Sequence, residues 1–368
     1  MIKVLTVVDK LNLGGIEKTL LGCLEHFNEN GVESHILCSH GGILDDQFVE
    51  RGAILHNYKK SRWSFMRIYS FYKVILRSEV NVIHLRNGHT SGLYCLIGRL
   101  LNKFVIVSIH NESAMFKKTW QRNIFLNKIR NYYLLLQKEL IVLFSDRIIG
   151  HSKANLGYFS NYKDKIKRKS LIIYNGVDFS MLDASLEKTS IRNKNINLIH
   201  VGSFKHQKNH TMLLDIFKNL VKKGYKVSLD LCGDGELQEE IKLKSLGLKV
   251  RFHGNVNDLS SLFNKAHILL FPSKHEGFGN VHIEAQYMKV AICCSDIKPH
   301  YESVFDKYHR YFFPLNSIDI ATQKCEELIA RLHEKDADQL LEDAKLFSHK
   351  FSNVNMAEKL VNVYYDRK

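Results

Sequence analysis

The sequence has no run of the ~18 to 20 uncharged apolar residues that a membrane-spanning helix requires. Its first segment is interrupted by the charges of Lys3 and Asp9, too early for the apolar core of a secretory signal peptide. Internal repeats and low-complexity runs are also missing, and 45% of the residues are hydrophobic and 25% charged, as in ordinary globular proteins. The sequence therefore predicts a folded protein that stays in the cytoplasm.

Patterns typical of metal sites are missing too. The cysteines show no C-x-x-C spacing and no partnered histidines, so we expect buried, reduced thiols. The 19 histidines form no triad of metal-ligand spacing, and no D-x-D element is present. The sequence thus predicts neither a metal ion nor another cofactor. The seven cysteines are Cys23, Cys38, Cys95, Cys232, Cys293, Cys294 and Cys325.

Basic residues, in contrast, are abundant and unevenly placed. The net charge is +15, and residues 1–180 carry 26 Lys and Arg against 14 Asp and Glu, which gives +12 and leaves +3 for the remainder. The first half should therefore meet an anionic partner. Charge alone leaves open whether this partner is a nucleic acid, a phospholipid surface or a phosphorylated acceptor.

With 368 residues, the chain is long enough for two domains that each bury a core. Short β-branched runs alternate with helical patterns, which predicts two tandem, doubly wound α/β domains of the Rossmann type. We expect domain 1 at 1–180, a polar linker at 181–195, domain 2 at 196–350, and a helix at 351–368 that packs back on domain 1. The predicted strands are 2–8, 34–38, 81–85, 103–110, 146–151, 171–174, 197–201, 226–232, 249–253, 267–271, 290–295 and 311–313.

The most informative motif begins at Pro272, directly after an apolar strand. Glu276 lies in a glycine loop, and Glu284, eight residues later, lies in the second turn of a helix that opens near Asn280. The free N–H groups of residues 277–281 and the positive end of the helix suit phosphate oxygens. A carboxylate at Glu284 can accept hydrogen bonds from two ribose hydroxyls, and Glu276 can accept from a sugar. The predicted ligand-binding residues of this loop are Glu276, Gly277, Phe278, Gly279, Asn280, Val281 and Glu284.

This arrangement resembles the E-x7-E signature of the retaining glycosyltransferases of family 4, of the type found in bacterial polysaccharide synthesis, which have the GT-B fold of two Rossmann-like domains. The resemblance covers nearly the whole chain, because further short motifs follow in the family's order. These motifs lie at 14–17, 109–111, 174–178, 202–209, 232–237 and 250–254.

The resemblance also implies roles for charged and glycine residues. Gly14 and Gly15, after the first strand, resemble the loop that approaches the donor diphosphate. Lys208 matches the lysine that neutralises this diphosphate. The family usually has arginine directly after the glycine of this motif, whereas this chain has Ser203. Either Lys205 replaces that arginine or Ser203 donates a weaker, neutral hydrogen bond.

Three further residues are expected to border the donor. His110 ends an apolar strand, and similar enzymes use a histidine here against the transferred sugar, near the reacting carbon; a purely structural histidine is the alternative. Gly233 and Val256 should lie near the nucleotide base, which the family's habit suggests is uridine or guanosine. The predicted catalytic residues are His110, Lys208 and Glu276.

Two stretches, 59–73 and 116–133, mix cations with aromatic residues and include Trp63 and Trp120. As helices they would present apolar and basic faces, which is typical of an element resting on an anionic membrane. The alternative is a core-packing helix with a solvated cationic face. No nucleic-acid-binding module is recognisable, so nucleic acid is not an expected partner.

The combined expectation is a metal-independent, retaining transferase. It would move a sugar from a UDP- or GDP-linked donor in domain 2 to a glycan or lipid-linked acceptor on domain 1, in the cytoplasm or at the inner face of the plasma membrane. A nucleotide-sugar-binding protein without turnover and a sugar-nucleotide epimerase with the same fold are the alternatives. Release of nucleoside diphosphate on addition of an acceptor would separate them.

Overall fold

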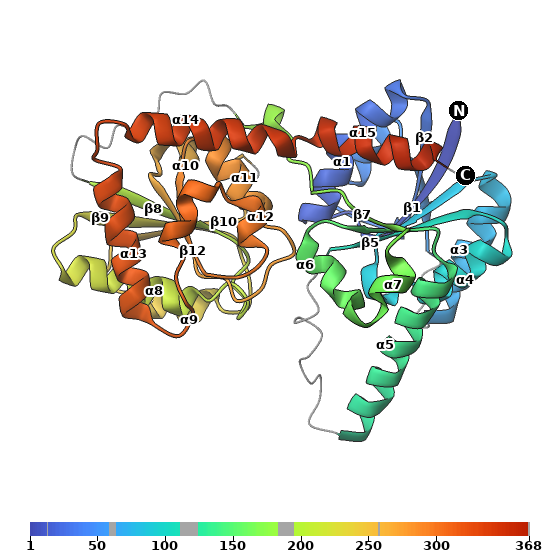
Figure 1. Cartoon of the computed structure of the whole chain (residues 1–368), viewed down its shortest axis with the longest axis horizontal. Coiled ribbons are helices and arrows are strands. Elements are labelled where there is room, and N and C mark those ends of the chain that lie inside the picture. Colours follow the sequence, from blue (N-terminus) through green and yellow to red (C-terminus); the bar gives the residue numbers. More distant parts are fainter. Residues whose placement is uncertain (13, 59–63, 111–123, 183–194, 257, 367–368) are drawn as a thin grey trace. The chain divides into compact units, whose positions relative to one another are not determined.

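The computed structural model describes residues 1–12, 14–58, 64–110, 124–182, 195–256 and 258–366 (Figure 1). The chain divides into two compact units. Unit 1 consists of Met1–Gly176 and Asn353–Lys368, and unit 2 of Val177–Ser352. Each unit is an α/β domain around one parallel sheet, which confirms the predicted fold class. The predicted linker falls almost wholly on 183–194, outside the described residues.

Seven parallel strands form the sheet of unit 1, in the order β3-β2-β1-β4-β5-β6-β7. The order reverses between β1 and β4, which pair directly, so the carboxyl ends of these neighbours mark the point where ligands of such sheets bind. The strands are β1 (Ile2–Lys10), β2 (Val32–Ser39), β3 (Ile54–Asn57), β4 (Val82–Leu85), β5 (Phe104–Ile109), β6 (Arg147–Gly150) and β7 (Ser170–Ile172).

Helices cover both faces of this sheet and bury two apolar clusters against it. The last helix, α15, lies against α1 (Figure 1). There the Tyr364 hydroxyl and His84 Nδ1 are hydrogen-bonded at 2.8 Å, which ties the end of the chain to β4. The helices of unit 1 are α1 (Gly15–Glu29), α2 (Asp45–Glu50), α3 (Ser64–Ser78), α4 (Gly92–Leu100), α5 (Ile124–Phe144), α6 (Lys153–Leu156), α7 (Lys163–Ile166) and α15 (Asn353–Tyr365).

The sheet of unit 2 has five parallel strands in the order β10-β9-β8-β11-β12, with its reversal between β8 and β11. Its strands are β8 (Ile196–Val201), β9 (Val227–Cys232), β10 (Val250–Gly254), β11 (Ile268–Phe271) and β12 (Ala291–Cys294). Its helices are α8 (His210–Lys222), α9 (Gln238–Lys244), α10 (Ser260–Lys265), α11 (Asn280–Tyr287), α12 (His300–Ser303), α13 (Ile318–Arg331) and α14 (Ala337–Ser348).

The strand predictions differ from the structure in two places: one strand was missed, and one predicted strand is not a strand. The sequence analysis missed β3, a short edge strand whose ends are exposed. The predicted strand 311–313 is a single bridge between Ser295 and Phe313. Phe313 donates its N–H to Cys294 and accepts from Asp296, but the next residue is Pro314, which has no N–H to continue a ladder.

All seven cysteines are buried and free, as predicted. Within the part of the chain that the structure describes, no helix has both the length and the apolar composition needed to cross a membrane.

Candidate functional site

The loop after β11 and the loop after β8 meet at the reversal of the unit 2 sheet. Gln207 connects them twice: its side-chain Nε2 donates to the carbonyl of His275 at 2.6 Å, and its own carbonyl accepts from the N–H of Lys274 at 2.8 Å. Because β8 and β11 are adjacent parallel strands, the loops leave the same edge of the sheet. Residues 68 positions apart in the chain are thereby fixed side by side.

Lys208 and Glu276, two of the predicted catalytic residues, form an ion pair at this place. The distance from Lys208 Nζ to Glu276 Oε1 is 2.7 Å, and the side chains are only 16% and 9% exposed. The ammonium group also lies 4.7 Å from the ring centroid of Phe271, in cation–π range. Each buried charge thus neutralises the other.

The glycine loop leads directly into α11. Gly279 precedes the helix with φ +100°, and an added Cβ would come within 2.6 Å of His282 Nδ1, so only glycine fits there. Gly277, Asn280 and Val281 are half-buried, and their backbone surrounds the amino end of the helix. Glu284 lies one turn further, also half-buried.

Phe278, also predicted in this loop, has a different environment. Its side chain is buried, with its ring centroid 5.3 Å from that of Phe351. A ligand at this loop can therefore meet only the backbone of Phe278.

The other predicted donor residues of unit 2 surround the same edge. Gly233 has φ +132°, and a Cβ would lie 2.2 Å from the carbonyl oxygen of Gly202, so the glycine lets the loops after β8 and β9 touch. Val256 is half-buried just beyond β10. Ser203 is half-buried and Lys205 is exposed; the backbone N–H of Lys205 donates to the Ser203 carbonyl at 2.7 Å.

Unit 1 holds the remaining predicted site residues. Gly14 and Gly15 are exposed at the amino end of α1. His110 directly follows β5 and is buried, with its ring stacked on that of His151 at a centroid distance of 4.1 Å. Burial, followed by the neighbouring His151 and Arg86, holds the pKa of His110 well below its usual value, so the ring is neutral. Residue 111 and those up to 123 lie outside the described residues.

Sequence reasoning missed Arg86 and His151. Each stands directly after a buried strand, Arg86 after β4 and His151 after β6, which is the position where parallel sheets bind ligands. The sequence offers one signal for Arg86: it is a cationic residue directly after the mostly apolar run 82–85.

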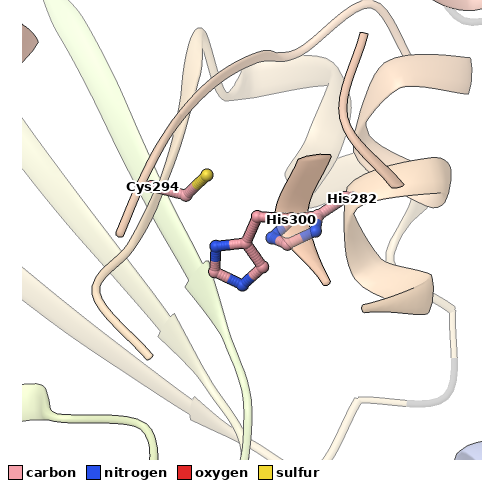
Figure 2. Close-up of side chains that lie close together, drawn as sticks. All are labelled: His282, Cys294 and His300. Atoms are coloured by element: carbon pink, nitrogen blue, oxygen red, sulfur yellow. The ribbon is translucent and has the colours of Figure 1, made fainter. Parts of the chain in front are cut away.

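It also missed a buried group beside the glycine loop. Figure 2 shows His282 of α11, Cys294 at the end of β12 and His300 at the start of α12 gathered together. His282 Nδ1 is hydrogen-bonded to Ser303 Oγ at 2.9 Å, and His300 Nδ1 donates to the carbonyl of Ser295 at 2.7 Å. Cys294 and these histidines show no common spacing in the sequence, because they come from three separate elements that meet only in the fold.

The ligand atoms of this group lie within 4.8 Å of one another, so the three could hold a metal ion. A closed zinc site has four protein ligands, and an open one keeps a position for water. The described residues supply three ligands, all buried. Burial lowers the pKa of His300 to about 4 and raises that of Cys294, so the group is uncharged. Its contacts indicate that it fixes the start of α11 against β12 and α12.

Comparison with known proteins agrees with this architecture. Residues 13–180 match the family model Glycosyltransferase Family 4, and residues 183–347 match Glycosyl transferases group 1. The chain is 26% identical to the capsular polysaccharide biosynthesis glycosyltransferase CapH of Staphylococcus aureus, over 100% of this chain and 99% of CapH. It is 27% identical to an N-acetyl-D-galactosaminyltransferase of Campylobacter jejuni whose name specifies a PP-undecaprenol-linked glycan, over 79% of this chain and 78% of that protein.

Among solved structures, Anabaena HepE in complex with UDP and glucose superposes with a TM-score of 0.77 at 16% identity, over 100% of both chains. Two glycosyltransferase family models thus match consecutive parts of the chain, and each part forms a parallel-sheet α/β domain. The chain belongs to the glycosyltransferases with the GT-B fold.

Proposed function

We propose that the protein is a retaining glycosyltransferase that takes a sugar from a nucleoside-diphosphate sugar bound in unit 2 and transfers it to a glycan or lipid-linked acceptor bound by unit 1. The observation that carries this proposal is the buried Lys208–Glu276 pair beside the amino end of α11. An ammonium group and a helix end favour a diphosphate, while the carboxylate favours sugar hydroxyls. A nucleotide sugar carries both a diphosphate and sugar hydroxyls, so it matches both kinds of group at this place.

In the proposed mechanism, the acceptor hydroxyl attacks from the same face that the diphosphate leaves. The departing phosphate oxygen takes the proton of the hydroxyl, and Lys208 and the N–H groups at 277–281 stabilise the charge that grows on the diphosphate. Lys208 exchanges its contact with Glu276 for the phosphate, which frees Glu276 to accept a sugar hydroxyl. No protein nucleophile is needed, and configuration is retained.

The setting we propose is polysaccharide biosynthesis. The CapH relative is named for capsular polysaccharide biosynthesis and matches over the whole chain. The Campylobacter relative is named for a PP-undecaprenol-linked substrate, which supports a lipid-linked acceptor. The two alternatives, a binding protein without turnover and an epimerase, are tested by adding acceptor and measuring nucleoside diphosphate, which only the transferase releases in proportion to the acceptor consumed.

Nucleotide binding without a metal ion is the first expected result. We expect UDP or GDP to bind, and the Kd to agree within about twofold between buffers with EDTA and with Mg²⁺, because Lys208 and the helix end supply the positive charge that a cation would otherwise supply. Isothermal titration calorimetry in both buffers measures this. Binding that disappears in EDTA and returns with Mg²⁺ or Mn²⁺ would contradict the metal-independent site.

We also propose that unit 1 contacts an anionic membrane at the inner face of the plasma membrane. Parts of the two cationic segments, 59–63 and 116–123 with Trp63 and Trp120, lie outside the described residues. The described part of α5 supports the proposal, because apolar side chains on its outer face are between 45% and 74% exposed: Ile129, Tyr132, Tyr133 and Leu136. Figure 1 shows that the amino-terminal part of α5 extends beyond the rest of unit 1.

A liposome assay tests this surface. Wild-type protein should sediment with anionic vesicles at low salt and less at physiological salt, since charge attraction is screened over roughly 8 to 10 Å. Leu136→Glu should weaken binding by about tenfold or more, because it removes an inserted Leu side chain worth ~1.5 to 3 kcal/mol. Leu246→Glu, at a site 76% exposed in unit 2, is the matched control and should bind like wild type. Equal loss in both variants, or no wild-type binding at low salt, would favour a soluble acceptor.

A further inference from the structure

The carboxyl ends of β4, β5 and β6 in unit 1 carry three buried polar side chains that are not fully used by the protein. Arg86, His110 and His151 are 4%, 8% and 0% exposed. The unpartnered atoms are Arg86 Nε and Nη2, both ring nitrogens of His110, and His151 Nε2. Burying polar atoms without hydrogen bonds costs free energy, and a charged group costs the most. Such a cluster at this edge of a parallel sheet indicates a ligand.

Arg86 is the main element of the cluster. Its backbone N–H donates to Val7 at 3.0 Å, which anchors it between β4 and β1, and its Nη1 donates to the Ile16 carbonyl at 3.5 Å. Glu17, in the first turn of α1, acts on Arg86 electrostatically, but no carboxylate of the described residues pairs with Arg86 within 4.0 Å. The buried guanidinium therefore has no ion-pair partner at close range among the described residues.

The open atoms of Arg86 define what it can bind. Nε and Nη2 form one edge of the guanidinium, with two parallel N–H bonds that match two oxygens of a phosphate or carboxylate. Arg251 shows this use in the same molecule, where its Nε and Nη2 both bind the Asp230 carboxylate at 2.7 Å. On Arg86 the two nitrogens of this edge have no hydrogen-bond partner, and the guanidinium lies against the first turn of α1, whose positive end adds to its preference for an anion.

The two histidines add a different preference. His151 Nδ1 donates to the Ile173 carbonyl at 2.7 Å, so its Nε2 carries a lone pair that can accept from a hydroxyl. Burial lowers the pKa of His151 to about 3 and that of His110 well below its usual value, so both rings are neutral. Neutral His110 offers one N–H and one lone pair. A ligand that satisfies the cluster thus has an anionic group for Arg86 and hydroxyl groups for the histidines.

We propose that Arg86, His110 and His151 form a subsite for a phosphate-bearing sugar, the phosphorylated end of the acceptor. The identity of the ligand as the acceptor rests on the proposed glycosyl transfer, whereas the anion subsite itself does not. The donor also contains phosphate, so the experiment must separate an acceptor phosphate from the donor diphosphate.

The test uses the full chain saturated with UDP, so that the donor site is occupied, and titrates glucose 1-phosphate, inorganic phosphate and glucose by calorimetry or ligand-observed NMR. We expect glucose 1-phosphate to bind more tightly than either phosphate or glucose. Arg86→Met should weaken binding of glucose 1-phosphate at least about tenfold, the usual effect of losing a charge-assisted bidentate contact. Arg86→Lys keeps the positive charge but lacks the two parallel N–H groups, so its affinity for glucose 1-phosphate should lie between those of wild type and Arg86→Met. UDP affinity should not change in either variant.

Thermal stability separates a binding role from a structural one. Because a buried charge with few hydrogen bonds contributes little to stability, Arg86→Met, similar in size and apolar, should unfold at the same or a higher temperature. His110→Phe should keep the stacking on His151 but weaken glucose 1-phosphate binding. Arg99→Met is the control, since Arg99 is an exposed arginine of unit 1 that pairs with Asp146. It should bind glucose 1-phosphate like wild type.

Three results would overturn the proposal. An equal fall in UDP affinity of Arg86→Met would assign the arginine to the donor diphosphate. A lower unfolding temperature with unchanged ligand binding would make Arg86 structural. Failure of UDP-saturated wild type to bind either glucose 1-phosphate or phosphate would remove the subsite, and leave the donor site and the proposed transferase activity untouched.

Discussion

Replacement of Lys208 by alanine is expected to lower the turnover number by about 10² to 10³-fold, the usual cost of removing one charge-stabilising donor from an active site. The donor Michaelis constant should change far less. Negative charge on the diphosphate grows as the glycosidic bond breaks, so an ammonium group at this position stabilises the transition state more than the bound substrate. Steady-state kinetics, with transfer or donor hydrolysis as the readout, separates the two constants.

The ion pair with Glu276 requires a stability control. Without Lys208, the Glu276 side chain, 9% exposed, loses its counterion, and the free energy of unfolding should fall by about 1 to 3 kcal/mol. In the double variant Lys208→Ala/Glu276→Gln, stability should largely recover because the orphan charge is gone, while turnover should stay low. Recovery of turnover together with stability would show that Lys208 acts only by holding the fold.

Lys205→Ala is the matched comparison for the site. Lys205 lies in the same loop, three residues earlier, and is exposed. If Lys205 takes the place of the arginine that the family usually has here, its removal should also lower turnover; if Ser203 does, Lys205→Ala should behave like wild type. A larger donor Michaelis constant with unchanged turnover in Lys208→Ala would contradict the leaving-group role.

The order of elements and the glycine loop could be predicted because they are local properties. Alternating β-branched and amphipathic runs predicted a parallel sheet in each half, and the segment around Gly279 predicted a turn into a helix, where the structure has φ +100°. The family resemblance placed Lys208 and Glu276 at one donor site, but their ion pair was not predicted. The physical cause of the ion pair is that β11 returns beside β8, which brings together two residues 68 positions apart that no local pattern connects.

The residues missed by sequence reasoning depend on such long-range contacts. Arg86 and His151 directly follow β4 and β6, the strands on either side of β5, which ends just before the predicted His110. A search by spacing also could not find the group of His282, Cys294 and His300, because a helix, a strand and a second helix bring them together (Figure 2). What remains unpredictable from sequence is thus mainly the order of strands, not their existence.

Glu284→Ala is expected to weaken donor binding by about 1.5 to 3 kcal/mol, roughly 10- to 100-fold in Kd, the range for a lost hydrogen bond to a charged group. The carboxylate lies one turn inside α11, where we assign it to the two ribose hydroxyls. Its neighbours Ile283 and Ala285 are fully buried and hold this turn of α11 in the core. Calorimetry with UDP or GDP measures the loss, and Glu239→Ala, at a glutamate whose side chain is 81% exposed, should bind like wild type.

The ribose assignment has a sharper test, because the partner atom can be removed from the ligand as well as from the protein. Wild type should bind the 2′-deoxy nucleotide more weakly than the ribonucleotide, whereas Glu284→Ala should bind both about equally, since the contact is already lost. The binding free energy lost with Glu284→Ala and that lost with the 2′-hydroxyl would then not add. The difference from additivity measures the coupling between the Glu284 carboxylate and the 2′-hydroxyl. Full additivity in a folded variant would mean that Glu284 and the ribose do not touch, and that the carboxylate faces another part of the donor.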